Sequence, residues 1–216
     1  MSIAVIGAAG QLGRDLCEQI GSDAVPLTHG EVELTDRASL SRILESLRPE
    51  VVVNAAAFNL VDAAEDRPAD AFGVNAFGVR ELSQVCRDIG CVLVHFSTDY
   101  VFGSDEEVSE PYDESAPPGP LSVYGASKLT GEYFVRAICP RHFVIRSCGL
   151  YGLRGSGGKG RNFVDTMLRL GKERGEVRVV NDQNCTPTFT ADLAAATLQL
   201  LSTRTFGLYH WTNSGY

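Results

Sequence analysis

Short apolar segments alternate along the chain with longer segments in which apolar residues recur at helical spacing. The short segments have the length of strands buried on both faces, and the longer ones have the period of amphipathic helices. The expected strands are Ile3–Ile6, Ala24–Leu27, Val51–Val53, Val92–Phe96 and Phe143–Arg146. The expected helices are Leu12–Ile20, Leu40–Leu47, Ala69–Ile89 and Lys128–Ile138. This order predicts an α/β fold, a Rossmann-type doubly wound parallel sheet with helices on both sides.

The same alternation continues into the last third of the chain. Further pieces are expected at Phe163–Leu170 and Ala191–Leu201 as helices, and at Val177–Val180 and Leu208–Trp211 as strands. A length of 216 residues allows one large domain, or one domain and a fragment of a second. We expect a dinucleotide-binding domain over residues 1–150 and a partial C-terminal substrate-binding region over residues 151–216. Within the latter, residues 181–200 are expected to pack back on the first domain.

A glycine-rich turn, Gly7-Ala8-Ala9-Gly10-Gln11-Leu12-Gly13, connects the first predicted strand to the first helix. In such a turn, the first glycine permits a tight bend and the second lets backbone N–H groups approach a pyrophosphate. The third lets the helix pack closely on its strand. The positive end of the helix favours phosphate. The setting predicts that NADP or NAD binds here, and the alternative is a purely structural turn. The expected contacts are Gly7, Gly10, Gln11, Leu12 and Gly13.

The preference between NAD and NADP stays open. An acidic residue closing the second strand would bind a ribose 2′-OH, and an arginine there would accept a 2′-phosphate. This strand ends Pro26-Leu27-Thr28-His29-Gly30 and offers neither. Glu33, Leu34 and Asp36 follow, and they either edge an adenosine pocket or form a solvated turn. Small side chains after the third strand leave room for a flat cofactor: Ala55, Ala56 and Ala57.

Tyr124 and Lys128 stand four residues apart at the start of a predicted helix, and therefore on one face. Reduction of a ketone requires a proton on its oxygen. A free phenol has a pKa of about 10, and a nearby ammonium is expected to lower it. Thr98 or Ser97 follows the fourth strand, at the edge where ligands bind in open parallel sheets. A hydroxyl there would bond the substrate carbonyl, or else form a strand-end turn. We predict Thr98, Tyr124 and Lys128 as the catalytic residues.

Asn75 is a polar residue inside an apolar stretch of the long predicted helix. It either orients Lys128 through a water molecule, next to the cofactor, or kinks a buried helix.

Other residues suggest an anionic, nucleotide-bearing substrate. The glycine-rich segment 152–161 carries Arg154, Lys159 and Arg161 and ends at Asn162, which opens the next helix. Basic side chains and a helix N-terminus suit a diphosphate; the alternative is a mobile basic loop. Asp62 either faces the substrate or forms the acidic first turn of a helix. Pro187 is expected in a turn that lines the same cleft.

Charge and cysteine content argue against several classes of binding partner. The net charge of −8 and the pI near 5.0 argue against a nucleic-acid or anionic-membrane partner, because either would need a basic surface. No apolar stretch approaches the roughly 20 residues that cross a bilayer, and the N-terminus is typical of a first strand rather than a signal peptide. The six cysteines show no CxxC pair or zinc spacing. We expect free thiols, no metal and a cytoplasmic location.

Together these segments resemble the extended short-chain dehydrogenases/reductases, and more closely the dTDP-4-dehydrorhamnose reductase family. The matching segments are GAAGQLG, VVVNAAAFNLVDAAE, FSTDYVF, VYGASKLTGE, NFVDTMLRLGKE, VVNDQNCTPTFTADLA and GLYHWTNSGY. The resemblance implies reduction of the 4-keto group of a dTDP-linked 6-deoxy sugar with NADPH or NADH, giving dTDP-L-rhamnose. It also implies the catalytic roles of Thr98, Tyr124 and Lys128. We further expect Asp99 and Tyr100 to contact the nucleotide-sugar substrate, and a homodimer as a candidate assembly.

Two departures from the family pattern bear on the substrate. Many members carry a tryptophan in an RTSWVYG segment that lines the sugar pocket, whereas this chain has Gly149 at that place. We therefore expect a wider pocket at Gly149 and a sugar that can differ from the rhamnose precursor. The chain also ends at Tyr216, before several elements that complete the small substrate domain in the family.

Two other functions fit the same resemblance. One is a non-catalytic nucleotide-binding subunit similar to the regulatory subunit of methionine adenosyltransferase. The other is a different extended short-chain enzyme, such as a nucleotide-sugar epimerase or dehydratase. Dehydratases use further acidic residues beside the strand-four hydroxyl. Here Asp99 is followed by Tyr100, which breaks the usual Asp-Glu pair and favours reduction.

Overall fold

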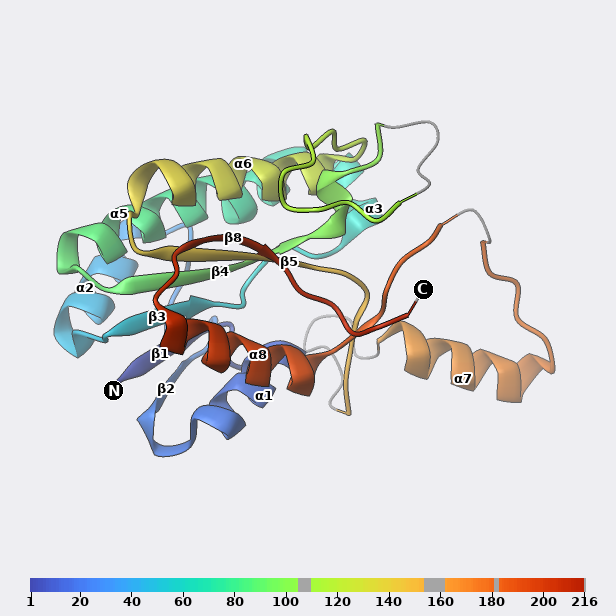
Figure 1. Ribbon diagram of the computed structural model, residues 1–216, viewed down its shortest axis with the longest axis horizontal. Helices are drawn as coiled ribbons and strands as arrows, with labels where there is room; N and C mark the ends of the chain where they lie inside the picture. The colour runs from blue at the N-terminus through green and yellow to red at the C-terminus, as the bar shows by residue number, and fades with distance from the viewer. Residues whose placement is uncertain (105–109, 154–161, 181–182, 216) are drawn as a thin grey trace.

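The centre of the molecule is a six-stranded sheet (Figure 1). The computed structural model describes residues 1–104, 110–153, 162–180 and 183–215. All neighbouring strands of the sheet are parallel. In spatial order they are β2 (Ala24–Leu27), β1 (Ile3–Ile6), β3 (Val51–Asn54), β4 (Val92–Thr98), β5 (His142–Ser147) and β8 (Gly207–His210).

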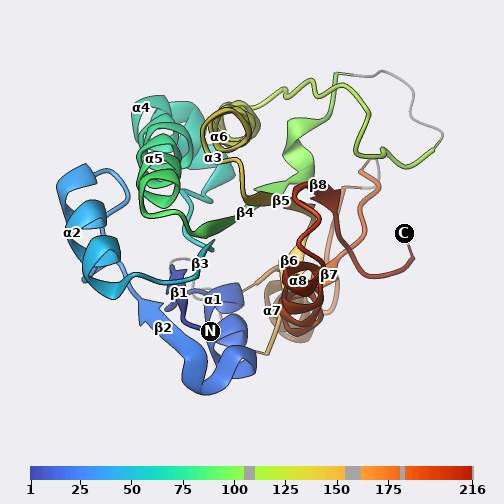
Figure 2. The ribbon, with the colours of Figure 1, turned by 60° about the vertical axis from the view of Figure 1, so that its left-hand side comes forward.

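Helices cover both faces of this sheet (Figure 2). One face carries α2 (Arg37–Leu47), α5 (Val79–Ile89) and α6 (Val123–Ile138); the other carries α1 (Gln11–Ile20) and α8 (Thr190–Thr203). Two separate clusters of buried side chains fill the layers, one with Leu40 and Leu82 and the other with Leu16 and Leu193. Each layer buries the apolar stripe of its helices against the branched residues of the strands. The predicted Rossmann-type doubly wound fold is confirmed.

The sheet order fixes where a ligand can bind. β2 and β3 lie on opposite sides of β1, so the direction of winding reverses between β1 and β3. In open parallel sheets, ligands bind outside the carboxyl ends of the strands at such a switch point. The residues that follow β1, β3 and β4 at this edge are Gly7, Ala55 and Asp99.

The long helix expected over 69–89 is divided into three pieces. After α3 (Val61–Asp66), the chain forms α4 (Pro68–Phe72), a π-helical segment (Gly73–Gly78) and then α5. The side chain of Asn75 in the wide π turn bonds both the N–H and the C=O of Phe58, each at 2.9 Å. These bonds attach the helix to the loop after β3. Single π turns inside helices often occur at functional sites, and a periodicity count does not detect them.

Two strand predictions differ from the structure. Val177–Val180 is not a strand, and its last two valines are 56% and 66% exposed. The structure also contains a short parallel pair that was not predicted, between β6 (Leu150–Tyr151) and β7 (Thr188–Phe189). Strands of two residues carry no detectable alternation, which explains why the pattern did not predict them. β2 is an edge strand with partly exposed side chains, and not a strand buried on both faces.

The C-terminal third returns to the sheet further than expected. α8 packs on α1, where Gln19 Nε2 donates to the carbonyl of Ala191 at 2.7 Å. β8 then pairs with β5, so residues 207–210 form an edge strand of the sheet. The division of the chain near residue 150 stays a prediction. In the described parts of the chain, no helix has both the length and the apolar content to span a membrane.

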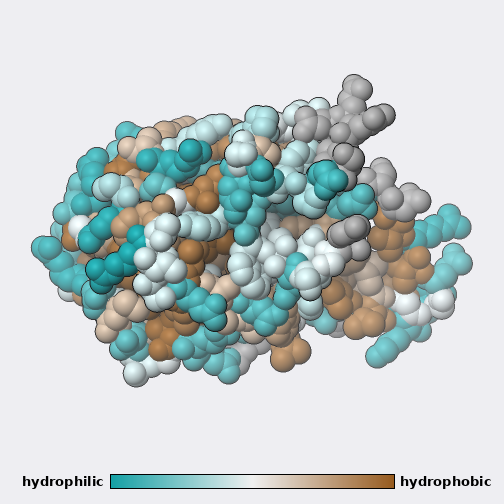
Figure 3. Space-filling model, viewed as in Figure 1, coloured by the Kyte–Doolittle hydropathy of each residue, from teal (hydrophilic) through white to brown (hydrophobic). Residues whose placement is uncertain are grey.

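α7 (Phe163–Arg174) extends away from the sheet (Figure 1). None of its described side chains is buried, and Phe163 and Leu168 are exposed. Figure 3 shows apolar surface in this part of the molecule.

Candidate active site

The glycine turn between β1 and α1 is built by close backbone packing. Gly7 adopts φ +81°, the left-handed region that favours glycine. A Cβ on Gly7 would lie 2.7 Å from the backbone nitrogen of Ala56, and a Cβ on Gly13 would overlap the carbonyl oxygen of Gly7. These two glycines therefore allow the helix, the turn and the residues after β3 to meet.

Gly10 differs from its two neighbours in the turn. It is the N-cap of α1 with an ordinary φ of −73°, and an added Cβ would meet only the Gly7 carbonyl oxygen, at 3.2 Å. The N–H groups of a first helical turn point along the axis toward this space. The first turn of α1 contains no acidic residue. Bare backbone, open space and the positive helix end fit a dinucleotide pyrophosphate. The side chain of Leu12 lies in the core, so only its backbone faces this site.

The residues predicted to line the adenosine pocket make contacts within the protein. The Glu33 carboxylate accepts from the N–H and hydroxyl of Thr35 and lies 3.0 Å from His29 Nδ1. Leu34 is buried in the core, and its contact with a cofactor stays a prediction. Asp36 caps α2 through the N–H groups at positions 38 and 39, and its place at the edge of an adenosine pocket stays a prediction.

Tyr124 lies in the first turn of α6. Ser122 caps this helix by accepting from the N–H of Gly125 at 3.0 Å, which places Tyr124 beside the end of β4. Burial raises the pKa of Tyr124 to about 12, and a hydrogen bond with Thr98 opposes that rise. The ring of Tyr100 meets the Tyr124 ring edge-on, with centroids 5.6 Å apart. A phenol with this pKa is fully protonated at neutral pH.

Lys128 lies one turn further along α6 and is 2% exposed. Its Nζ donates to the carbonyl oxygen of Phe96 at 2.7 Å and lies 3.4 Å from His95 Nε2. Burial lowers the pKa of Lys128 to about 8, with the Glu132 carboxylate acting in the opposite direction. The expectation that Lys128 lowers the pKa of Tyr124 is not met. The amine is directed to β4, and the pKa of the phenol is raised.

A buried ion pair behind Lys128 was not predicted from the sequence. Glu132 accepts from Nε and Nη2 of Arg146, at 2.9 and 2.7 Å, and from the hydroxyl of Ser97. Ser97 is therefore engaged in the core, which leaves Thr98 as the hydroxyl nearest the site. The sequence could have indicated Glu132, because it follows Lys128 by four residues and shares its helix face. Nothing in the sequence indicated that Arg146 in β5 is its partner.

Thr98 closes β4 with its hydroxyl held by its neighbours. Its Oγ1 donates to Asp99 Oδ1 at 3.0 Å and accepts from the N–H of Tyr100 at 3.2 Å. Burial raises the pKa of Tyr100, as do the carboxylates of Asp99 and Asp62. Asp62 lies in the first turn of α3. The structure thus brings together the expected substrate residues from the β3–α3 and β4–α6 connections.

Asn75 does not bond Lys128 in the described structure. Besides its two bonds to Phe58, its amide donates to the hydroxyl of Ser127 at 3.0 Å. Ser127 precedes Lys128 on α6. Asn75 therefore anchors the helix that carries Lys128 through Ser127, and a water-mediated contact with Lys128 itself stays a prediction.

Asn162 connects the expected substrate region to the phosphate turn. It caps α7 by accepting from the N–H of Asp165 at 2.8 Å, and its amide donates to the carbonyl of Gly152 at 3.0 Å. The same amide reaches Gln11 Oε1 at 3.4 Å. Gln11 is the first residue of α1, so Asn162 lies beside the predicted pyrophosphate position.

Gly149 and Pro187 are also brought into contact. Gly149 adopts φ +53°, and an added Cβ would lie 3.3 Å from the α-carbon of Pro187. The wider sugar pocket at Gly149 stays a prediction. The basic residues expected to bind the diphosphate, Arg154, Lys159 and Arg161, lie outside the described residues.

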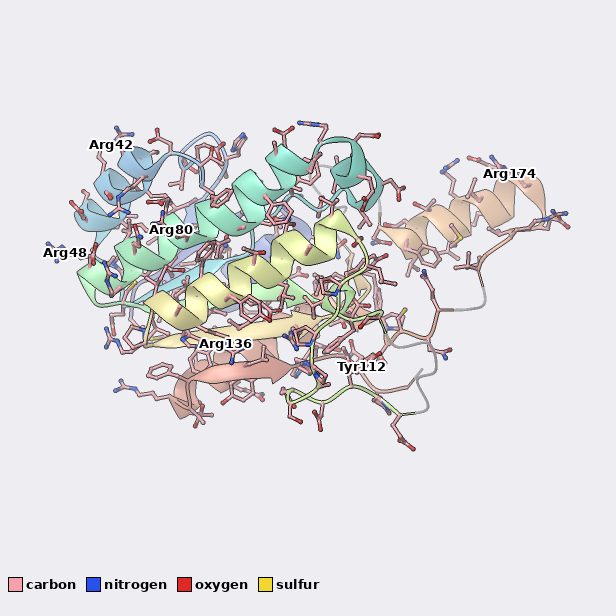
Figure 4. All side chains as sticks on the ribbon, turned by 90° about the horizontal axis from the view of Figure 1, so that it is seen from above. Arg42, Arg48, Arg80, Tyr112, Arg136 and Arg174 are labelled. Carbon is pink, nitrogen blue, oxygen red and sulfur yellow. The ribbon has the colours of Figure 1, made fainter. Side chains whose placement is uncertain are left out.

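The segment after β4 rims the same edge of the sheet. The ring of Tyr112 stacks on Phe102 with centroids 4.2 Å apart, and its carbonyl accepts from Nδ1 of His210 at 3.0 Å. Figure 4 shows Tyr112 at the carboxyl ends of the strands, with Arg42 and Arg48 at the opposite end of the molecule. Among the described residues, no group of three His, Cys, Asp or Glu side chains is arranged to hold a metal ion.

Comparisons with known proteins agree with this geometry. The family model described as the RmlD substrate binding domain matches residues 1–216. The chain is 41% identical over 220 residues to the dTDP-4-dehydrorhamnose reductase of Streptomyces griseus, covering 98% of this chain and 70% of that relative. It is 40% identical over 215 residues to the dTDP-4-keto-6-deoxy-D-glucose reductase of Streptomyces niveus, covering 98% and 72%. A solved dTDP-4-dehydrorhamnose reductase from Bacillus anthracis in complex with NADP superposes with a TM-score of 0.93 at 38% identity, covering 100% of this chain and 76% of that one.

Proposed function

Because this chain belongs to the dTDP-4-dehydrorhamnose reductase family, we propose that Thr98, Tyr124 and Lys128 reduce the 4-keto group of a dTDP-linked 6-deoxy sugar. The chain is an NADPH- or NADH-dependent oxidoreductase acting on a nucleotide sugar. The comparisons favour this function over a non-catalytic regulatory subunit. The bound cofactor would supply the hydride.

The observation that carries the proposal is the position of the Tyr124 phenol. It lies beside Thr98 at the carboxyl end of β4, and burial keeps it protonated. As negative charge develops on the carbonyl oxygen, Tyr124 Oη donates its proton to that oxygen, and Thr98 holds the carbonyl in place. Lys128 lies one turn away on α6, and its amine would hold the nicotinamide ribose of the cofactor.

The residues present fit the dinucleotide. Gly10 offers open space beside the first turn of α1, and Ala56 and Ala57 follow β3 with small side chains. We propose that the pyrophosphate binds the N–H groups of Gln11, Leu12 and Gly13. We also propose that the segments around Asn162, Gly149 and Pro187 contact the sugar nucleotide together with Asp62, Asp99 and Tyr100.

We expect Gly10→Val to weaken NADPH binding at least tenfold. The valine side chain would occupy the pyrophosphate position, while the turn keeps its φ and needs only a small shift of the Gly7 carbonyl. Isothermal titration calorimetry measures the effect. Gly73→Val is the matched control, because nothing lies within 4 Å of an added Cβ there. Equal affinities of the parent and Gly10→Val for NADPH would show that the cofactor does not bind at this turn.

The pH dependence of kcat/KM for NADPH tests the charge of Lys128. The ammonium is present below its pKa, so we expect kcat/KM to fall as the pH rises through about 8. Tyr124, with a pKa of about 12, stays protonated over that range. Lys128→Met should bind NADPH more weakly and lack this limb. A limb near pH 8 that persists in Lys128→Met must come from another group.

The sugar is decided by a substrate panel. NADPH oxidation is followed with dTDP-4-dehydrorhamnose and with dTDP-4-keto-6-deoxy-D-glucose, the substrates that the names of two relatives indicate. We expect turnover with at least one, and the smaller residue at Gly149 favours acceptance of both. NADPH binding without turnover of either sugar would instead support the regulatory function. The homodimer and the cytoplasmic location stay predictions, of which light scattering tests the first.

A further inference from the structure

His95 is a fully buried histidine in β4, in direct contact with the predicted active site. Its two ring nitrogens face different partners. Nδ1 lies 3.1 Å from the amide nitrogen of Asn54, and Nε2 lies 3.4 Å from Nζ of Lys128. In the sequence, His95 is a polar residue within an apolar predicted strand, and the pattern did not indicate a role for it.

The orientation of Asn54 determines the proton position on this ring. Asn54 Oδ1 accepts from the backbone N–H of Ala56 at 3.2 Å, so the atom facing His95 is the amide nitrogen. An amide nitrogen can only donate, and Nδ1 must therefore accept. A neutral imidazole carries one proton, which then resides on Nε2. Burial lowers the pKa of His95 well below its usual value, so the ring is neutral.

The Nε2–H group therefore points at the amine of Lys128. An ammonium has no lone pair, so two donors face each other, whereas a neutral amine would accept from Nε2. The close approach of α6 to His95 depends on a glycine in that helix. Gly131 lies one turn beyond Lys128, where even a Cβ would come within 3.6 Å of His95 Nε2 and overlap the carbonyl of Asn75.

We propose that His95, fixed as the Nε2–H tautomer by Asn54, is a positioning residue for Lys128. It disfavours the ammonium and directs the amine to the carbonyl of Phe96. Other charged groups act on the same amine. Glu132 favours the ammonium from α6, and its carboxylate is paired with Arg146 from β5. The assignment of an effect on turnover rests on the proposed reductase function, but the tautomer does not.

The first test is the tautomer itself, which needs no activity. Long-range ¹H–¹⁵N NMR spectra of the ¹⁵N-histidine-labelled protein, assigned with His95→Gln, distinguish the two nitrogens. We expect a proton on Nε2 and a lone pair on Nδ1. A proton on Nδ1 would overturn the proposal, whether or not the protein reduces a sugar.

The second test reverses the hydrogen bond. In Asn54→Asp, the carboxylate accepts from both Ala56 and His95, so the ring proton moves to Nδ1 and Nε2 becomes an acceptor for the ammonium. The pKa of Lys128 should rise, and the alkaline limb of kcat/KM for NADPH should move up by about one unit. Asn59→Asp makes the same covalent change at an exposed position of the loop after β3. It should leave the limb in place.

A tautomer that switches in Asn54→Asp while the limb stays at its original pH would contradict the coupling. Two further variants keep the test open if that protein does not fold. His95→Gln can accept from Asn54 and donate toward Lys128, so it should retain the limb near pH 8. His95→Leu should shift it. The same limb in both would mean that His95 only fills space.

Discussion

We expect Tyr124→Phe to lower turnover by about 10²–10⁴-fold, the usual contribution of a positioned general acid. The change removes only the hydroxyl that lies beside Thr98 at the end of β4, where the carbonyl oxygen must take up its proton. The ring itself keeps its edge-on contact with Tyr100. Steady-state NADPH oxidation with the sugar that the panel identifies measures kcat.

Two controls separate this effect from a change in folding. Tyr133→Phe deletes the same hydroxyl nine residues further along α6, on a side chain that is 51% exposed, and should leave kcat unchanged. The NADPH dissociation constant of Tyr124→Phe should stay close to that of the parent. Full turnover in Tyr124→Phe would exclude the phenol as the proton donor.

Glu132→Gln should lower the free energy of unfolding by about 3–5 kcal/mol, because it leaves the buried Arg146 guanidinium without a counter-charge. Both side chains are almost completely buried, at 0% and 4% exposed. Glutamine keeps an acceptor for Ser97 but not the charge. Urea denaturation followed by circular dichroism measures the change.

The exposed pair of Arg169 and Glu173 on α7 is the matched control. It has a comparable N–O distance of 2.6 Å, but water solvates both charges, so Glu173→Gln should change stability little. The double variant Glu132→Leu with Arg146→Met should recover most of the loss, because apolar residues of similar volume can replace a buried ion pair. Unaltered stability of Glu132→Gln would show that the pair contributes nothing to folding.

Several parts of the fold were predictable because they depend on local periodicity. The strands β1 to β5 and the helices α1, α2 and α6 follow from apolar spacing, and their ends differ from prediction by a few residues. The π-helical segment did not follow, because the bonds of Asn75 within it reach a loop 17 residues earlier and have no counterpart in local periodicity. β6 and β7 did not follow either, because two-residue strands depend on their partner.

The candidate site divides along the same line. The sequence by itself determined the glycine turn, the Tyr124–Lys128 spacing and the place of Thr98, because helix geometry and the common edge of parallel strands fix these relations. Only the tertiary structure decided the bond from Lys128 to Phe96, the donor facing it from His95 and the pairing of Glu132 with Arg146. Those contacts join residues 32, 33 and 14 positions apart. Their energies depend on burial, which removes water from the charged groups, and burial exists only once the sheet and α6 have packed together.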